Sequence, residues 1–370
     1  MKNPMDKFII LLLLLTVLFA FFATVIFSES TINLSARSAV LYEPVTKDFV
    51  YEKNADEKLS MASTTKIMTA LVALENFPCD GEVAIPEQAV GIEGSSLYLK
   101  AGECFLMKDL ITGLMLRSAN DAAVAIAYAV AGSVEGFSDL MNERALSLGL
   151  VNTHFENPHG LDSPGHYTTA RELAVIAAEA LDNDTFKEIT STKKTTITNT
   201  DGEVRLVTNH NKLLSMYDGA IGVKTGFTKK SGRSLVGACE RDGLTLITVT
   251  IDAPDDWNDH KKLFDYGYSH LSVRRLANAG DLCYNIPVLG SDKEYITVKN
   301  EKSLDIILKS TDEMPKISIS LPRYTAAPVR KGEALGRAIL TQNGRIIGEL
   351  ELIATDDAQK IQHKKLFDFK

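Results

Sequence analysis

The sequence predicts a mixed α/β fold, an antiparallel sheet flanked by helices, followed by a small all-β domain at the C-terminus. Strand-like runs precede and follow a block of amphipathic helices along the chain, so the first and last strands can share one sheet. Helical periodicity fades after about residue 275, and short β-type runs replace it. The 370 residues are also enough for two domains of roughly 150 residues each, with a small piece left over.

Composition excludes several other classes of protein. Hydrophobic residues make up 45% of the chain and charged residues 24%, which rules out general disorder. The formal net charge of −8 argues against a nucleic-acid partner. Four cysteines are too few for a disulfide scaffold, and we expect buried thiols. A disulfide between Cys79 and Cys104, which flank an expected hairpin, remains the alternative.

Residues 1–30 have the features of a signal peptide or an N-terminal membrane anchor. Residues 8–27 carry no charge, and Lys2 and Lys7 precede them, which is the layout of an export signal. This run is long for a cleaved signal and close to a membrane span, so cleavage after Ser30 and retention both stay open. In either case we expect an exported protein, on the outer face of the cytoplasmic membrane or in the cell wall or periplasm.

The first domain is expected over residues 31–271. A turn at 44–47 predicts a hairpin between strands 39–43 and 48–52. Ser133 is a plausible N-cap for one of the helices that follow, and Gly149 would end that helix. Apolar positions at helical spacing predict helices within 61–77 and over 107–116, 121–130, 134–148 and 169–181. Two strands and a last helix are expected over 234–238, 244–251 and 260–271.

The second domain is expected over residues 275–355, with a short polar tail over 356–370. Asn343-Gly344 is a strong signal for a two-residue hairpin turn. The β-type runs of this domain cover 294–298, 304–308, 316–320, 334–340 and 346–353.

Ser63 and Lys66 form the first of three short motifs with chemical potential. Their i, i+3 spacing places both on one face of a helix, a turn apart. A serine hydroxyl needs a base before it becomes a good nucleophile, and a lysine can act as that base when burial and nearby positive charge lower its pKa. An N-capping serine followed by a solvated lysine is the ordinary alternative.

The second and third motifs are S-x-N and K-T-G. Ser118 and Asn120 place a hydroxyl and an amide two residues apart, suited to relaying a proton and holding a peptide carbonyl. Asn120 could equally cap the helix that follows it. In the segment 224–226, a lysine, a threonine and a glycine would let an extended peptide approach a strand edge, although a hairpin turn would also use such residues.

In this order, S-x-x-K, S-x-N and K-T-G resemble the motifs of penicillin-binding proteins and class A β-lactamases, with Ala119 where that pattern has Asp. The surrounding residues narrow the resemblance to low-molecular-mass penicillin-binding proteins, the serine-type D-alanyl-D-alanine carboxypeptidases of the peptidase S11 kind. The resemblance covers about residues 36–271, continues into the β domain, and implies a β-lactamase/transpeptidase-like catalytic domain. The segments that carry it are 62–69, 94–97, 120–122, 159–162, 209–214 and 222–226.

The resemblance implies roles for the matching positions. Ser63 would form the acyl ester, and Lys66 would be its general base. Ser118 would relay a proton to the leaving D-alanine, and Asn120 would position the substrate backbone. Lys224 and Thr225 would assist the relay and hold the terminal carboxylate, and Gly226 would also bind the substrate. The backbone N–H groups of Ser63 and Phe227 would form the oxyanion hole.

Two segments depart from the pattern of the family. Some relatives bind the substrate carboxylate with an arginine in the segment after the last core strand, but residues 255–260 contain none. Arg233 is a speculative substitute, and a solvent-facing strand residue is an equal alternative. The tail shows no clean apolar stripe of the kind that an amphipathic membrane helix has, so the N-terminal run is the better membrane anchor if this run is not cleaved.

His159 is expected to brace the wall of the site.

The resemblance implies an enzyme that removes the terminal D-alanine from peptidoglycan pentapeptide stems and that β-lactams inhibit covalently. It implies no metal or other cofactor. A β-lactamase of class A would need E-x-x-L-N, and residues 154–159 do not fit that pattern. A D,D-endopeptidase with the same chemistry stays open, and so does a non-catalytic wall-associated scaffold. Three intact motifs weigh against the scaffold.

Overall fold

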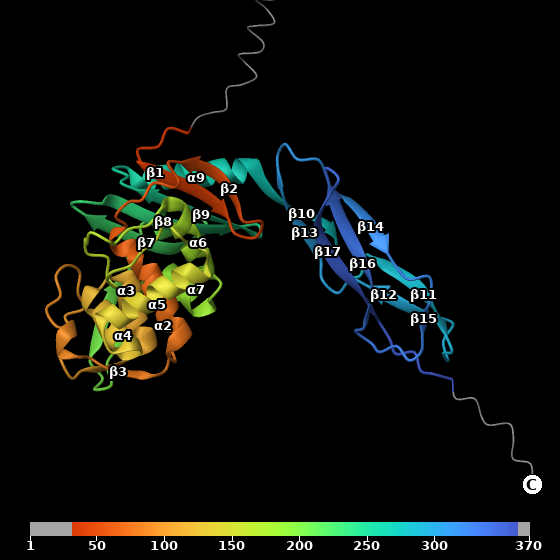
Figure 1. Ribbon diagram of the computed structural model, residues 1–370, viewed down its shortest axis with the longest axis horizontal. Helices are drawn as coiled ribbons and strands as arrows, with labels where there is room; N and C mark the ends of the chain where they lie inside the picture. Colours follow the sequence, from red (N-terminus) through yellow and green to blue (C-terminus); the bar gives the residue numbers. More distant parts are fainter. Residues whose placement is uncertain (1–31, 362–370) are drawn as a thin grey trace, which may run out of the picture.

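The computed structural model describes residues 32–361 of the chain. The expected signal or anchor at 1–30 lies outside this range, as does most of the expected tail. A mixed α/β domain is followed by an elongated all-β domain (Figure 1), which confirms the predicted fold class.

A five-stranded antiparallel sheet forms the middle of the first domain, with the strand order β2-β1-β9-β8-β7. The N-terminal hairpin therefore shares one sheet with the later strands, as expected. Strand β7, which carries the K-T-G motif, lies at the edge of the sheet. The strands span Ser38–Glu43 (β1), Asp48–Lys53 (β2), Ala220–Thr228 (β7), Gly232–Arg241 (β8) and Leu244–Ile251 (β9).

Both faces of this sheet are covered. In β1 all six residues are buried, and alternate side chains enter different cores because strand side chains alternate in direction. Val40 and Tyr42 pack with the helices on one face, whereas Ala39 and Leu41 pack with α9 on the other (Figure 1). The helices on the first face are α2 Lys66–Asn76, α3 Met107–Leu116, α4 Asn120–Ala131, α5 Val134–Ser147, α6 Ala170–Leu181 and α7 Asp184–Ser191, and α2 is preceded by the 3-10 turn η1 Ala62–Thr65.

The helix ends follow the sequence signals in most places. The Ser133 hydroxyl accepts a hydrogen bond from the backbone N–H of Gly136 at 2.9 Å, so the predicted N-cap of α5 is confirmed. The predicted start of the last helix at residue 260 is wrong, because α9 spans Asp256–His270. Its first turn is polar and therefore lacks an apolar pattern, but acidic residues there stabilise the positive end of the helix dipole.

Several short elements were not predicted. They are too short or too polar to show a clear period in the sequence. In the first domain they are α7, the helix α8 Leu213–Met216, the hairpin β5 Lys194–Thr198 with β6 Val204–Thr208, and the 3-10 turn η2 Glu87–Ala89. The antiparallel strand pair β3 Glu82–Ala84 with β4 Cys104–Leu106 was expected near Cys79 and Cys104 and is confirmed.

The C-terminal domain contains a six-stranded sheet in the order β14-β16-β17-β12-β11-β15, and a two-stranded sheet of β10 and β13. Asn343 and Gly344 both have positive φ, at 51° and 76°, which confirms the predicted hairpin turn. The backbone of Ala358 pairs with Val329, so the expected tail begins inside this domain. Its strands are β10 Leu271–Ala277, β11 Cys283–Leu289, β12 Tyr295–Lys299, β13 Leu304–Lys309, β14 Lys316–Ser320, β15 Thr325–Ala326, β16 Ala334–Gln342 and β17 Arg345–Ala354.

All four cysteines are free thiols. Cys239 is buried as expected, Cys79 and Cys104 are half-buried, and Cys283 is exposed, so the expectation of buried thiols is wrong for Cys283.

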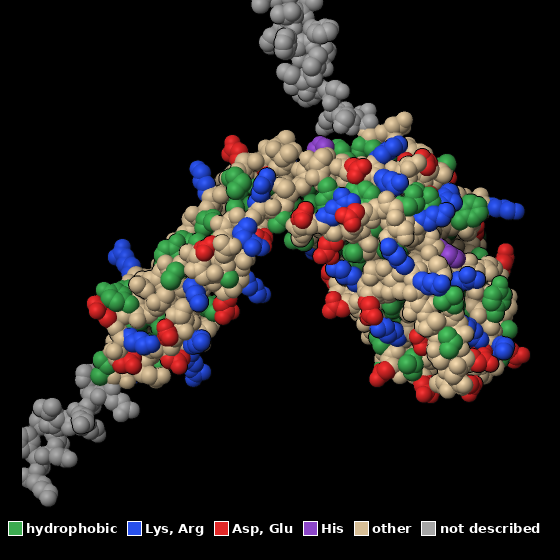
Figure 2. All heavy atoms as spheres, turned by 180° about the vertical axis from the view of Figure 1, so that it is seen from behind, with side chains coloured by type: hydrophobic (Ala, Val, Ile, Leu, Met, Phe, Trp, Pro, Cys, Tyr) green, Lys and Arg blue, Asp and Glu red, His purple; other side chains and the backbone are tan. Residues whose placement is uncertain are grey.

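Over residues 32–361, no single helix is long and apolar enough to cross a bilayer, and α4 with α5 satisfies this test only as a pair bent by 82°. Acidic and basic side chains are interspersed over both domains on the face shown in Figure 2.

Candidate active site

A pocket of about 380 Å³ lies where the edge strand β7 meets η1. Six of the nine predicted site residues line it, and the other three, Lys66, Asn120 and Lys224, are buried and hydrogen-bonded near it. The structure therefore brings together residues that are up to 170 positions apart in the chain (63 to 233). The lining residues are Ser63, Ser95, Ser118, His210, Lys212, Thr225, Gly226, Phe227, Arg233, Asp256 and Trp257.

The Lys66 amine lies against the Ser63 hydroxyl, with 3.0 Å between Nζ and Oγ. It also contacts Asn120 Oδ1 at 2.6 Å and the backbone carbonyl of His159 at 2.5 Å. Burial lowers the pKa of Lys66 well below its ordinary value, and the positive charge of Lys224 lowers it further, while Asp121 opposes this shift. A neutral Lys66 has a lone pair that can accept the Ser63 proton, so the geometry suits a nucleophile and its base.

Lys224 is the second buried amine near the pocket. Burial lowers its pKa to about 7, and its Nζ donates to the backbone carbonyl of Thr225 at 2.9 Å. An amine that titrates near neutral pH can carry a positive charge beside the pocket or release it with a small change in conditions.

Ser118 lies in the sharp turn between α3 and α4, and Asn120 is the first residue of α4. Ser118 is buried with a positive φ of 60°, a conformation that non-glycine residues seldom adopt. The Asn120 amide donates through Nδ2 to the carbonyl of Glu93 at 2.6 Å while its Oδ1 meets Lys66. The surrounding structure therefore holds the hydroxyl and the amide in fixed positions.

Asp121 holds a neighbouring loop in place, although it was not among the predicted site residues. Its carboxylate accepts hydrogen bonds from the backbone N–H groups of Leu97 and Leu99, at 3.0 and 3.1 Å, and from the Ser96 hydroxyl at 2.6 Å. Ser95, in the same loop, lines the pocket. The signal was present in the sequence, since an acidic residue directly follows the S-x-N motif.

Two glycines allow the backbone to approach Ser63 closely. A Cβ on Gly226 would lie 3.1 Å from the backbone nitrogen of Ser63, so β7 runs directly beside Ser63. A Cβ on Gly160 would lie 1.9 Å from the carbonyl oxygen of Ala62, and Gly160 also has a positive φ of 87°. The contact at Gly160 requires a residue without a side chain, whereas a Cβ at Gly226 would be tighter than ordinary contacts and would need its neighbours to shift slightly.

The segment around His159 forms the wall behind α2. The Thr69 hydroxyl donates to the carbonyl of Pro158 at 2.6 Å, and the Thr65 hydroxyl contacts the His166 ring at 2.7 Å. Burial, and then the charge of Lys66, lowers the pKa of His159 to about 3, so this ring is neutral at ordinary pH. His159 contacts Lys66 through its backbone carbonyl.

Arg233 lines the pocket from β8 and forms an ion pair with Asp256, with 3.0 Å between Nη2 and Oδ2. Its guanidinium also lies over the ring of Trp257, 5.8 Å from the ring centre. Asp256 and Trp257 were not among the predicted site residues, because the segment 255–260 stands out in the sequence only for its lack of an arginine. No sequence pattern indicates that Arg233 on β8 contacts the start of α9, because the two segments meet only when α9 packs against the sheet.

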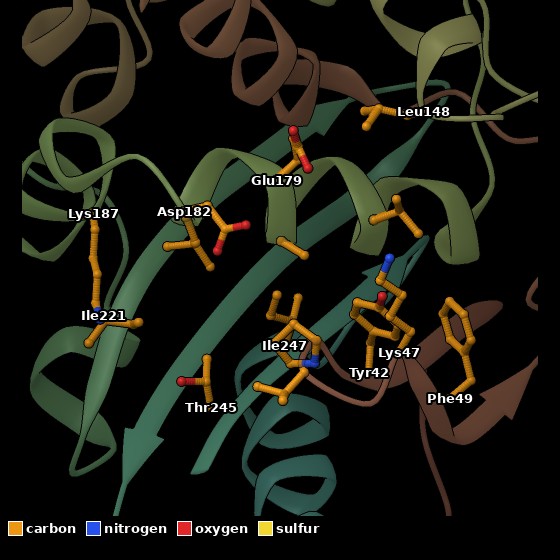
Figure 3. Close-up of a pocket in the computed structure, with 15 residues that line it drawn as sticks. Tyr42, Lys47, Phe49, Leu148, Glu179, Asp182, Lys187, Ile221, Thr245 and Ile247 are labelled. Atoms are coloured by element: carbon orange, nitrogen blue, oxygen red, sulfur yellow. The ribbon is translucent and has the colours of Figure 1, made fainter. Parts of the chain in front are cut away.

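A larger cavity, about 680 Å³, lies between α6 and the sheet (Figure 3). Its walls include apolar side chains such as Tyr42, Phe49 and Ile247, and none of the residues that line it belongs to the three motifs. The candidate site is therefore the smaller pocket.

Comparisons with known proteins identify the family of this chain. Residues 25–255 match the family described as D-alanyl-D-alanine carboxypeptidase, and residues 272–360 match the penicillin-binding protein 5 C-terminal domain. DacF of Bacillus subtilis (strain 168), a D-alanyl-D-alanine carboxypeptidase, is 32% identical, with 88% of this chain and 86% of DacF aligned. DacC of Escherichia coli (strain K12), which has the same description, is 31% identical over 93% of this chain and 90% of its own length.

Solved structures of similar proteins include penicillin-binding protein 5 from Haemophilus influenzae. That structure is 28% identical, has a TM-score of 0.66, and covers 89% of this chain and 98% of its own. The Streptomyces K15 DD-transpeptidase is 35% identical, with a TM-score of 0.61, over 64% of this chain and 98% of its own. Since one family match covers most of the first domain and relatives align over nearly the whole length, the chain belongs to the D-alanyl-D-alanine carboxypeptidase family of serine peptidases.

Proposed function

We propose that this protein removes the terminal D-alanine from peptidoglycan pentapeptide stems through an acyl-enzyme on Ser63. The observation that carries the proposal is the contact between Ser63 Oγ and the buried Lys66 amine, whose pKa burial lowers. Membership of the family supports the substrate class, since its curated members are D-alanyl-D-alanine carboxypeptidases.

Acylation begins when neutral Lys66 accepts the Ser63 proton and Oγ attacks the carbonyl carbon of the penultimate D-alanine. The carbonyl oxygen becomes negatively charged and meets the backbone N–H groups of Ser63 and Phe227. When the C–N bond breaks, Ser118 relays a proton to the nitrogen of the departing D-alanine. Water then attacks the ester carbonyl carbon. Its oxygen bonds to that carbon, the bond to Ser63 Oγ breaks to release the shortened peptide, and a proton from the water restores the Ser63 hydroxyl.

Substrate binding involves the rest of the pocket. Asn120 positions the peptide backbone, and β7 offers its edge to an extended peptide at Gly226. Thr225, with the charge of Lys224, receives the terminal carboxylate, and Arg233 adds a second cationic contact. A β-lactam presents a reactive amide and a carboxylate of the same kind, and would acylate Ser63 as a covalent inhibitor.

We further propose that catalysis belongs to residues 31–271 and that residues 275–355 are a separate β domain. The enzyme is exported, and residues 1–30 attach it to the membrane if they are not cleaved. The charge-free run at 8–27 supports this localisation. N-terminal sequencing of the exported protein distinguishes the two forms, because cleavage exposes a residue near Thr31 and retention leaves the original N-terminus.

The test of the function uses the full chain, fluorescent penicillin and a diacetyl-lysyl-D-alanyl-D-alanine peptide. We expect a covalent adduct on Ser63 and release of D-alanine, and Ser63→Ala should abolish both. Ser147→Ala, which changes a serine at the end of α5, is the matched control and should behave as the wild type. A wild-type chain that forms no adduct on Ser63 and releases no D-alanine refutes the proposal.

A further inference from the structure

We propose that Asp256 is a positioning residue that holds Arg233 in place to recognise the carboxylate of the substrate's C-terminal residue. This inference rests on the proposed function, because it concerns the leaving-group end of the same pocket. It assigns a role to the first turn of α9, a segment without an arginine of its own.

The two members of the ion pair differ sharply in exposure. The side chain of Asp256 is 3% exposed, whereas that of Arg233 is 43% exposed and lines the pocket together with Ser63 and Thr225. Asp256 is therefore the fixed partner and Arg233 is the one that substrate can reach. A guanidinium has five N–H donors, so the contact of Nη2 with Asp256 leaves donors for a second carboxylate.

Asp256 is itself held firmly. Its Oδ1 accepts a hydrogen bond from the backbone N–H of Trp257 at 2.9 Å, and it lies in the first turn of α9, where the helix dipole favours a negative charge. The ring of Trp257 lies beside the guanidinium and limits its movement further. An arginine held in this way loses less conformational entropy when it binds a carboxylate.

The charges around the pocket suit an anionic ligand despite the presence of Asp256. Arg233 and Lys212 line the pocket, and Lys224 lies close by. Asp256 is the single acidic side chain among the lining residues. Burial lowers the pKa of His210, the remaining titratable group of the lining, and the charges of Lys224 and Arg117 lower it further. A substrate carboxylate therefore enters a site with an excess of positive charge.

The experiment compares two peptides that differ only at the C-terminus, diacetyl-lysyl-D-alanyl-D-alanine and its carboxamide. Asp256→Asn keeps an oxygen for the Trp257 N–H but removes the charge that holds Arg233. We expect KM for the acid to rise about tenfold with little change in kcat, and kinetics on the carboxamide to stay unchanged. Asp256→Glu should restore part of the preference for the acid.

Asp255→Asn is the matched control, since Asp255 is the exposed neighbour and its carboxylate binds Asn258 instead of Arg233. It should keep the wild-type preference for the acid. If Asp256→Asn loses activity equally on the acid and on the carboxamide, Asp256 has only a structural role and the inference is overturned. An unchanged preference for the acid over the carboxamide would also overturn it. A wild type that hydrolyses neither peptide refutes the proposed function, and the inference falls with it.

Discussion

Two cavities of the first domain differ in size and in the charges that lie close to them. The larger one, about 680 Å³, has apolar walls, and two of its charged residues are paired outside it, Glu179 with Arg144 and Lys187 with Glu240. The smaller one, about 380 Å³, has two fully buried amines close to it, Lys66 and Lys224, whose pKa values burial lowers.

This difference shows that volume does not locate the chemistry. Burying an amine is unfavourable unless other interactions compensate for it, so a fold that retains two such amines side by side does so for a functional reason. A cavity whose charged side chains are paired, as Glu179 and Lys187 are, or exposed, as Lys47 and Asp182 are, needs no such reason. Changes at four positions test this contrast, beginning with the largest expected effect.

Replacing Lys66 should affect the chemistry far more than the fold. Lys66→Ala removes the base of Ser63 together with an unfavourable buried amine, so we expect acylation by fluorescent penicillin to slow about 1,000-fold while the urea midpoint stays near that of the wild type. Lys187→Ala, at the larger cavity, is the control and should acylate normally. A Lys66→Ala rate within threefold of the wild type would contradict the assignment of the base.

Adding a methyl group behind the nucleophile should destabilise the site. In Gly160→Ala the new Cβ would meet the Ala62 carbonyl oxygen, and we expect a loss of about 3 kcal/mol in the free energy of unfolding, with slower acylation as η1 moves. Gly149→Ala has a similar positive φ but no atom within 4 Å, so it should lose only about 1 kcal/mol. Equal losses in urea unfolding would show that the close contact with η1 is unimportant.

The buried amines should make stability depend on pH. Burial lowers the pKa of Lys224 from 10.5 to about 7, so between these values the unfolded chain binds more protons and the free energy of unfolding rises with pH. Lys224→Met should flatten this rise, as measured by urea midpoints near pH 7.5 and near pH 9.5. If the urea midpoint of the variant rises with pH as steeply as that of the wild type, Lys224 keeps an ordinary pKa in the folded protein.

Filling the larger cavity should have the smallest effect. Ala178→Leu adds apolar volume at the cavity wall on α6, and we expect stability to change by no more than about 1 kcal/mol and acylation to stay within twofold of the wild type. A large change in acylation would show that this cavity is coupled to the active site and would remove the contrast between the two regions.

Local patterns explain which features were predictable. Ser63 and Lys66 are one helical turn apart, and β1 and β2 are joined by a short turn. The Ser133 hydroxyl caps α5 by accepting a hydrogen bond from the backbone N–H three residues further along the chain. In each case the interacting groups are neighbours in the chain, so residue type and spacing are sufficient. The polar start of α9 and the short strands β5 and β6 show no such pattern, and they were missed.

By itself, the sequence determined the fold class and the order of the three motifs, and it placed Ser63 and Lys66 one helical turn apart. Only the tertiary structure decided that Lys66 meets Asn120 from 54 residues away and the His159 carbonyl from 93 residues away. It also decided that Asp256, at the start of α9, meets Arg233 on β8. The reason is physical: a pKa depends on desolvation and on the charges nearby, and both arise only when distant segments pack together.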